Sequence, residues 1–313
     1  MKPRVRALLS WPTDRQRRSR AATRIAVGAA KDLDDISAND LPLSPSTDTA
    51  TATSIYGRLL ETPEATALCK RLGLTRGDVR DLRRKFDDED GTHSDSVTLR
   101  GLFHLLNNNF QLEKSHVLTQ ALLDLAAVPP LASRVSFDQY LLIACTFAAF
   151  TEPQLWRFFY DVYSTGDGEM ELQSARAGRF EATLKAVGGS YAHNIQVATR
   201  RLAASQLEGK ATSLRFVDFE ELVRRHPVAF YPLVQLQRNV RGCTLGESFW
   251  EGKVQEQELL PPLLAYLRLH RGKLPRMRLK DWAMGRVFSG NTSVVRARLL
   301  ALRLFNEDED VAG

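Results

Sequence analysis

The chain has 313 residues and a formal net charge of +6, from 43 Lys and Arg against 37 Asp and Glu. A composition of 43% apolar and 26% charged residues is typical of a globular protein and excludes a collagen-like or fully disordered chain. Cys69, Cys145 and Cys243 are too few and too far apart for a disulfide framework or a zinc site, which favours a reducing, cytoplasmic location. No apolar run approaches the roughly 20 residues of a membrane-spanning helix, so we expect no transmembrane segment.

Residues 1–54 are predicted to form a disordered basic arm followed by a linker rich in Ser, Thr and Pro. The first thirty residues hold eight Lys or Arg and a single acid, Asp14. Three interpretations remain open: a solvated tail, an arm that docks on an acidic polymer such as tubulin, and an Arg-rich mitochondrial presequence cleaved near Ala30. The candidate docking residues are Arg15, Arg17, Arg18 and Arg20.

A short hydrophobic pattern recurs four times between positions 97 and 219. It consists of an apolar residue, a second one two positions later and a third one three positions further on, at the start of a predicted helix. An amphipathic helix is predicted ahead of each copy. The first positions are Val97, Val135, Met170 and Leu214. Their separations of 38, 35 and 44 residues indicate a repeated supersecondary unit.

The order of helix, short loop, strand-like step and second helix is the layout of an EF-hand. Residues 75–227 resemble the calcineurin-B-like and neuronal-calcium-sensor proteins, and the segments VSFDQYL (135–141) and LRFVDFEELVRRHP (214–227) are similar to the exiting segments of that family. The resemblance implies a mostly α fold with four helix–loop–helix units in two pairs, at 55–150 and 151–228. It also implies that short bridges join the first loop with the second and the third with the fourth.

Most of the calcium ligands of such loops are missing. A calcium-binding loop supplies oxygens from positions 1, 3, 5, 7, 9 and 12. In the third loop, Asp167 stands at position 5, but Tyr163 occupies position 1 and Ser174 position 12. The second loop has an apolar first half, and the fourth keeps only Asp218 at position 12. These three loops are therefore not expected to bind calcium, although Asp167 stays a weak candidate ligand.

The first loop is the acidic exception. Counting back from Val97 places Asp90 at position 1, whereas counting forward from Phe86 places Asp87 there, and the first of these frames has Gly101 at position 12. A solvated acidic turn is the favoured interpretation, and a weak divalent-ion site is the alternative. We therefore expect no cofactor except weakly held Ca²⁺ at this loop. Its candidate ligands are Asp87, Glu89, Asp90 and Asp95.

Residues 229–313 are predicted to form a basic helical extension with an acidic tail. An amphipathic helix at 231–240 is expected either to fill a groove between the preceding helices or to act as a spacer. Further helices are expected at 259–269 and 293–305, and the stretch 271–305 has nine Lys or Arg and one acid. The candidate partner-binding residues are Trp250, Arg276, Arg278, Arg296, Arg298 and Arg303.

No catalytic signature accompanies these patterns. The sequence lacks an H-E-x-x-H helix, a G-x-S-x-G elbow, a Walker loop and a kinase signature, so we expect no enzyme. The predicted function is a non-catalytic scaffold or adaptor that binds a protein partner, with a microtubule-based cytoskeletal or flagellar assembly as a candidate. The alternatives are a calcium sensor that uses the first loop and a mitochondrial protein with a cleaved presequence. Nucleic acid is not an expected partner.

Overall fold

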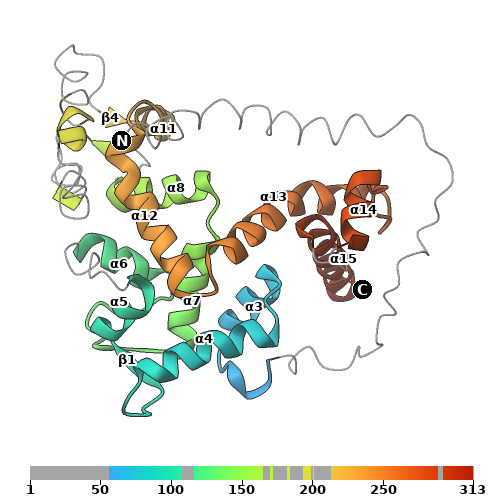
Figure 1. Cartoon of the computed structure of the whole chain (residues 1–313), viewed down its shortest axis with the longest axis horizontal. Coiled ribbons are helices and arrows are strands. Elements are labelled where there is room, and N and C mark those ends of the chain that lie inside the picture. Colours follow the sequence, from blue (N-terminus) through green and yellow to red (C-terminus); the bar gives the residue numbers. More distant parts are fainter. Residues whose placement is uncertain are drawn as a thin grey trace. The chain divides into compact units, whose positions relative to one another are not determined.

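A computed structural model gives the fold of the chain (Figure 1). It describes residues 56–107, 116–164, 170–171, 182–183, 193–198, 200, 213–287 and 292–312. The predicted arm at 1–54, including Arg15, Arg17, Arg18 and Arg20, lies outside the described residues, and so does Asp167. The chain divides into two compact units, with residues 52–258 in the larger one. Residues 229–258, assigned from sequence to the C-terminal extension, therefore belong to the larger unit.

The described part of the larger unit is mostly helical, as the sequence predicts. It begins with a short 3₁₀ turn, η1, and continues through helices interrupted by very short strands (Figure 1). In chain order the elements are η1 (Gly57–Leu59), α3 (Pro63–Leu72), α4 (Arg76–Glu89), β1 (Ser96–Thr98), α5 (Leu99–Asn107), α6 (His116–Asp124), β2 (Arg134–Ser136), α7 (Phe137–Ala149), α8 (Glu152–Tyr163), β3 (Met170–Glu171), β4 (Ser213–Leu214), α11 (Phe216–Arg225), α12 (Pro227–Cys243) and the first half of α13 (Glu247–Leu269).

Local sequence signals fix where several of these helices begin. Thr75, Ser136 and Thr151 each cap a helix N-terminus, and the residue three positions later bonds back to the cap's backbone N–H. Such a capping box satisfies two backbone N–H groups that the first turn of a helix leaves without partners. At the other end of α3, Gly73 adopts φ +60°, a left-handed conformation that suits glycine and ends the helix.

Two short antiparallel bridges join loops that are far apart in the sequence. β1 pairs with β2 so that Val97 lies opposite Val135, and β3 pairs with β4 so that Met170 lies opposite Leu214. These four residues are the first positions of the hydrophobic repeat. The predicted pairing of the first loop with the second, and of the third with the fourth, is therefore confirmed.

Helix α12 packs against both α5 and α7 (Figure 1). Its apolar side is buried at Phe230, Leu233, Leu236 and Val240, on a spacing of three to four residues that places them on one face. The interior Pro232 is buried as well. Of the two interpretations of segment 231–240, the structure supports the one in which the segment fills a space between preceding helices, rather than the spacer.

Polar side chains of α12 also close the C-terminal end of α7. The side-chain amide of Gln237 donates to the carbonyl oxygens of Phe147 (3.0 Å) and Phe150 (2.9 Å). The Arg241 guanidinium donates to those of Ala148 (2.8 Å) and Phe150 (3.1 Å). The last carbonyls of a helix have no partners within it, and a buried carbonyl without a partner costs about 1–3 kcal/mol. Helix α12 thus supplies both the apolar cover of α7 and its cap.

Helix α3 is held at its N-terminal end by a side chain from far along the chain. The buried carboxylate of Asp138, in the first turn of α7, accepts hydrogen bonds from the backbone N–H groups of Glu61 (2.9 Å) and Thr62 (2.6 Å). It also accepts one from the Thr62 hydroxyl at 2.7 Å. A carboxylate at a helix N-terminus complements the partial positive charge there.

Lysine side chains donate hydrogen bonds to backbone carbonyls at the C-terminal ends of two further helices. Lys253 of α13 donates to the Gly73 carbonyl at 2.9 Å, just past α3, and pairs with Glu256 at 3.1 Å. Both side chains of this pair are buried, at 6% and 1% exposed. Lys85 of α4 donates to the carbonyls of Cys243 (2.8 Å) and Thr244 at the end of α12. Each cation meets the negative end of a helix dipole, which is the favourable arrangement.

The smaller unit contains the end of α13, α14 (Leu279–Val287) and α15 (Ser293–Ala312). Its core consists of Leu260, Leu267, Leu300, Ala301 and Phe305. The predicted helix at 259–269 is the second half of α13, which begins at Glu247 and continues through Pro261 and Pro262. In the part of the chain that the structure describes, no helix is long and apolar enough to span a membrane.

The buried Lys253–Glu256 pair gives a test of the cap at α3. Lys253→Met removes the ammonium from the buried Glu256 and from the Gly73 carbonyl, so the free energy of unfolding should fall by about 3–5 kcal/mol. In the double variant Lys253→Met/Glu256→Leu no buried charge remains, and most of the loss should be recovered. Urea unfolding followed by circular dichroism measures both. Lys273→Met, at an exposed lysine, is the control, and a Lys253→Met variant as stable as this control would contradict the assignment.

Candidate functional site

The first acidic loop begins one turn later than one of the two sequence frames predicts. Helix α4 continues to Glu89, so Asp87 and Asp88 lie in its last turn and the loop starts at Asp90. The frame counted back from Val97 is therefore the one that the structure has, and the frame counted from Phe86 is wrong. Three acids in the last turn of a helix oppose its dipole, so they need compensating positive groups.

Of the four candidate ligands in the first loop, Asp90 is the one whose carboxylate bonds to other residues of the loop interior. It is 4% exposed, and its Oδ1 accepts hydrogen bonds from the hydroxyls of Thr92 (3.0 Å) and Ser94 (3.1 Å). Burial raises the pKa of this carboxyl, but the Thr92 and Ser94 hydroxyls and the backbone of Ser96 and Ser94 outweigh it, so the net pKa is lowered. The loop is thus built to hold a negatively charged Asp90.

Arg134, the first residue of β2, reaches across the bridge into this loop. Its Nε donates to the Ser96 hydroxyl at 2.7 Å. Its Nη2 donates to the Ser94 hydroxyl and to the Ser96 carbonyl, both at 2.5 Å, and lies 3.8 Å from Asp90 Oδ1. The guanidinium therefore forms an ion pair with Asp90. It ties the first loop to the second.

The remaining acids of the loop turn away from Asp90. Arg83 binds Asp87 at 2.7 Å and also bonds Asp95. Asp95 adopts φ +54°, a left-handed conformation that aspartate tolerates better than most residues, and its side chain is 75% exposed. Asp95 therefore makes the turn of the loop, and its carboxylate is bound outside it.

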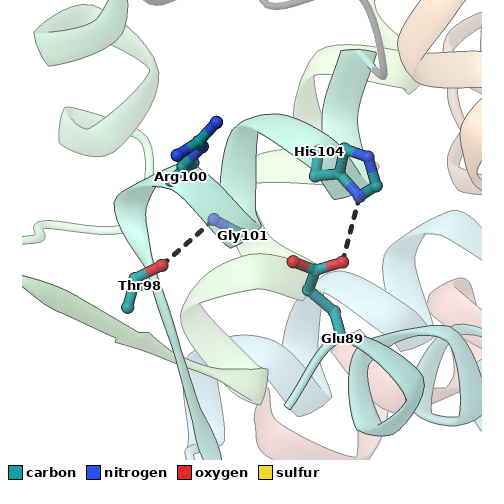
Figure 2. A pocket seen from close by; sticks show the side chains of 5 residues that line it. All are labelled: Glu89, Thr98, Arg100, Gly101 and His104. Atoms are coloured by element: carbon teal, nitrogen blue, oxygen red, sulfur yellow. Dashed lines mark hydrogen bonds and ion pairs between the residues drawn. The ribbon is translucent and has the colours of Figure 1, made fainter. Parts of the chain in front are cut away.

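Glu89 lies at the edge of a small open pocket of about 270 Å³ (Figure 2). Its carboxylate contacts Nδ1 of His104 at 3.0 Å, and Thr98, Arg100 and Gly101 complete the lining. A Cβ at Gly101 would stand 3.1 Å from Glu89 Oε1, so the glycine makes room for this carboxylate. The pocket is shallow and shows no convergent nucleophile and base.

The four predicted ligands are thus not brought together. Asp90 is held inside the loop by hydroxyls and by Arg134, Asp87 and Asp95 are bound by Arg83, and Glu89 is bound by His104. Within the described ranges, no group of three or more His, Cys, Asp or Glu side chains is arranged to hold a metal ion.

The predicted partner-binding arginines of the smaller unit fall into two environments. Arg276 and Arg278 are exposed on the segment that leads into α14. Arg296, Arg298 and Arg303 of α15 are half-buried; burial lowers the pKa of Arg298, and Arg303 lies 3.9 Å from Glu307.

The structure corrects the expectation for Trp250. Its side chain is fully buried, and its indole N–H donates to the Thr244 hydroxyl at 2.8 Å. Because the ring closes the junction between α12 and α13, it belongs to the core and not to a contact surface.

Sequence reasoning missed Arg134, although a signal for it exists. Arg134 directly precedes Val135, and the bridge places it opposite Thr98. The pairing of the two loops therefore already implies that a long cation at this position can reach the oxygens of the first loop.

No protein-family model, no curated protein and no solved structure matches the chain.

The lowered pKa of Asp90 gives a pH-dependent test. A carboxylate whose folded pKa is lowered stabilises the fold fully above its unfolded pKa, near 3.9, and loses that contribution as the pH falls through the folded value. The melting temperature of Asp90→Asn should therefore lie below that of the wild type by a constant amount from about pH 5 to 8, and the difference should shrink below about pH 4.

Thermal unfolding across this pH range measures the effect. Asp88→Asn, an equal charge change at an exposed residue two positions away, is the matched control and should show no such pattern. A difference that stays constant down to pH 2, or one that the control reproduces, would contradict the role of Asp90.

Proposed function

We propose that the chain is a non-catalytic scaffold or adaptor of EF-hand-like fold, which binds an acidic protein surface through its smaller unit and has lost calcium binding in its first loop. The observation that carries this proposal is an apolar face of α14 that is exposed to solvent and bordered by cations. A microtubule-based cytoskeletal or flagellar assembly is the candidate partner, since such assemblies present acidic surfaces.

The arrangement of helices around the bridges supports the EF-hand-like assignment. β1 is flanked by α4 and α5, β2 by α6 and α7, β3 follows α8, and β4 precedes α11. The first positions of the hydrophobic repeat lie opposite one another in the two expected pairs, Val97 with Val135 and Met170 with Leu214. Paired helix–loop–helix units of this kind generally act by presenting surfaces to other proteins.

The orientation of α14 determines which residues meet a partner. Gly285 is buried, and a Cβ there would stand 3.2 Å from Cγ2 of Val295, so this side of α14 packs on α15. The opposite side carries Leu279, 69% exposed, and Val287, 73% exposed, eight residues apart and hence on one face. Met284, on the same helix, is 49% exposed. We call the set Arg276, Arg278, Leu279, Lys280, Met284 and Val287 the α14 surface.

The chemistry of the α14 surface indicates an acidic protein. Exposed apolar side chains that cluster together mark interaction sites. Arg276, Arg278 and Lys280 are all exposed next to them, so an apolar centre is combined with a positive border. That combination suits a partner with apolar side chains among carboxylates, because opposite charge steers the encounter and apolar contact holds the complex.

No observation favours the calcium sensor as a second function. Each candidate carboxylate of the first loop is already bound by an arginine, a histidine or a hydroxyl group of the protein. The mitochondrial alternative and a docking role for the arm concern residues outside the described ranges. A cytoplasmic location remains part of the proposal.

Co-sedimentation of the full chain with microtubules assembled from purified tubulin tests this function. We expect the chain to pellet with microtubules, and the bound fraction to fall as the salt concentration rises. Reversing three charges of the α14 surface, in Arg276→Glu/Arg278→Glu/Lys280→Glu, should weaken binding at least about tenfold, because like charges then face each other.

The matched control reverses three exposed arginines of the larger unit, in Arg80→Glu/Arg84→Glu/Arg224→Glu, and should bind like the wild type. Equal loss in both variants would show that net charge alone is responsible and would contradict the α14 surface. A wild-type chain that stays in the supernatant at low salt would contradict the microtubule partner. Pelleting with anionic lipid vesicles and not with microtubules would replace the acidic protein by a membrane surface.

A further inference from the structure

One nitrogen of Arg134 lies among three oxygens of the first loop. Nη2 lies 2.5 Å from the Ser94 hydroxyl, 2.5 Å from the Ser96 carbonyl oxygen and 3.8 Å from Asp90 Oδ1. The Thr92 hydroxyl joins the same network through Asp90 at 3.0 Å and Ser94 at 3.1 Å. Residues 90, 94 and 96 thus turn oxygens toward one positive group, and the hydroxyl of residue 92 bonds to two of these residues.

The spacing of these oxygens is that of a divalent-ion loop. A calcium-binding loop uses side chains at positions 1, 3 and 5 and the backbone carbonyl at position 7. Counted from Asp90, these are Asp90, Thr92, Ser94 and the carbonyl of Ser96. Position 6, where such loops need a sharp turn, is Asp95 at φ +54°. The loop therefore keeps the shape of an ion site around a guanidinium.

We propose that the guanidinium of Arg134 takes the place of a bound cation in this loop and holds the loop in the conformation described above, which we call its closed form. This inference rests on the helix–loop–helix assignment of the proposed function. Arg134 comes from the second loop, so the same side chain that neutralises Asp90 also joins the two loops beside the β1–β2 bridge. The closed form then depends on a covalently attached cation and not on the calcium concentration.

The last position of the loop also differs from that of a calcium-binding loop. Position 12, which supplies a bidentate glutamate in a calcium site, is Gly101. The Glu89 carboxylate occupies the adjacent space, 3.1 Å from where a Cβ at Gly101 would be, and is held by His104. The same Cβ would stand 3.2 Å from Cγ of Glu89 and 3.4 Å from Cβ of Val97, so a glutamate at position 101 requires the Glu89 side chain to shift. Two substitutions should therefore convert the loop into an ion site.

The decisive experiment compares thermal unfolding in EDTA and in CaCl₂ for four full-length chains: wild type, Arg134→Met, Gly101→Glu, and Arg134→Met/Gly101→Glu. In EDTA, Arg134→Met should lower the melting temperature by about 2–4 °C, since the loop loses its cation. In about 10 mM CaCl₂ the double variant should gain at least ~3 °C. The wild type and Gly101→Glu, which keep Arg134, should not respond.

Two controls keep the result specific. Arg84→Met removes a 71%-exposed arginine that pairs with Asp81 in the same helix, and it should change neither the melting temperature nor the calcium response. Arg134→Lys retains a cation and should resemble the wild type in its indifference to calcium. Arg134 keeps 42% of its side-chain surface exposed, so its replacement leaves the core intact.

Two outcomes would overturn the inference. An Arg134→Met variant that melts like the wild type would show that Arg134 does not hold the loop. A double variant that calorimetric titration with CaCl₂ shows to be silent at millimolar concentration would show that the loop oxygens do not surround a cation position. Either result leaves binding through the α14 surface untouched, because that proposal is tested by partner binding of the smaller unit.

Discussion

The larger unit depends on one constraint. The backbone N–H and C=O groups at the ends of its helices have no partners within the helix and must find them elsewhere. In a fold made of short helices, each buried end needs a partner from elsewhere. Asp138 of α7 supplies it for the start of α3, Lys253 of α13 for its end, Gln237 and Arg241 of α12 for the end of α7, and Lys85 of α4 for the end of α12. Each bond joins segments that are distant in sequence, so the hydrogen bonds that complete the helix ends also hold distant segments together.

The same principle applies to the charges of the first loop. A loop rich in oxygens and carboxylates has to neutralise its charge, and Arg134 and Arg83 do so here with groups of the chain itself. Helix α12 likewise occupies the surface of α5 and α7 that a partner helix could otherwise fill. In our proposal the larger unit is therefore a fixed support, and the smaller unit carries the contact surface.

Features with a local signature could be predicted from the sequence. The repeat led to the pairing of Val97 with Val135, and a run of apolar residues led to α12. What failed depends on contacts between distant residues. Periodicity does not show that Trp250 would close the junction after α12, that α4 would extend through Asp87, or that Arg134 would reach Ser94. Such contacts follow only once the loops are paired in space.

In our proposal, protein side chains and not ions hold the first two loops in a single closed form. Hydrogen–deuterium exchange of the full chain, followed by mass spectrometry in EDTA and in millimolar calcium, tests it most directly. We expect the same slow exchange in both conditions for the amides of 90–98 and 134–149. Exchange in these segments that is fast in EDTA and becomes slow on adding calcium would contradict it.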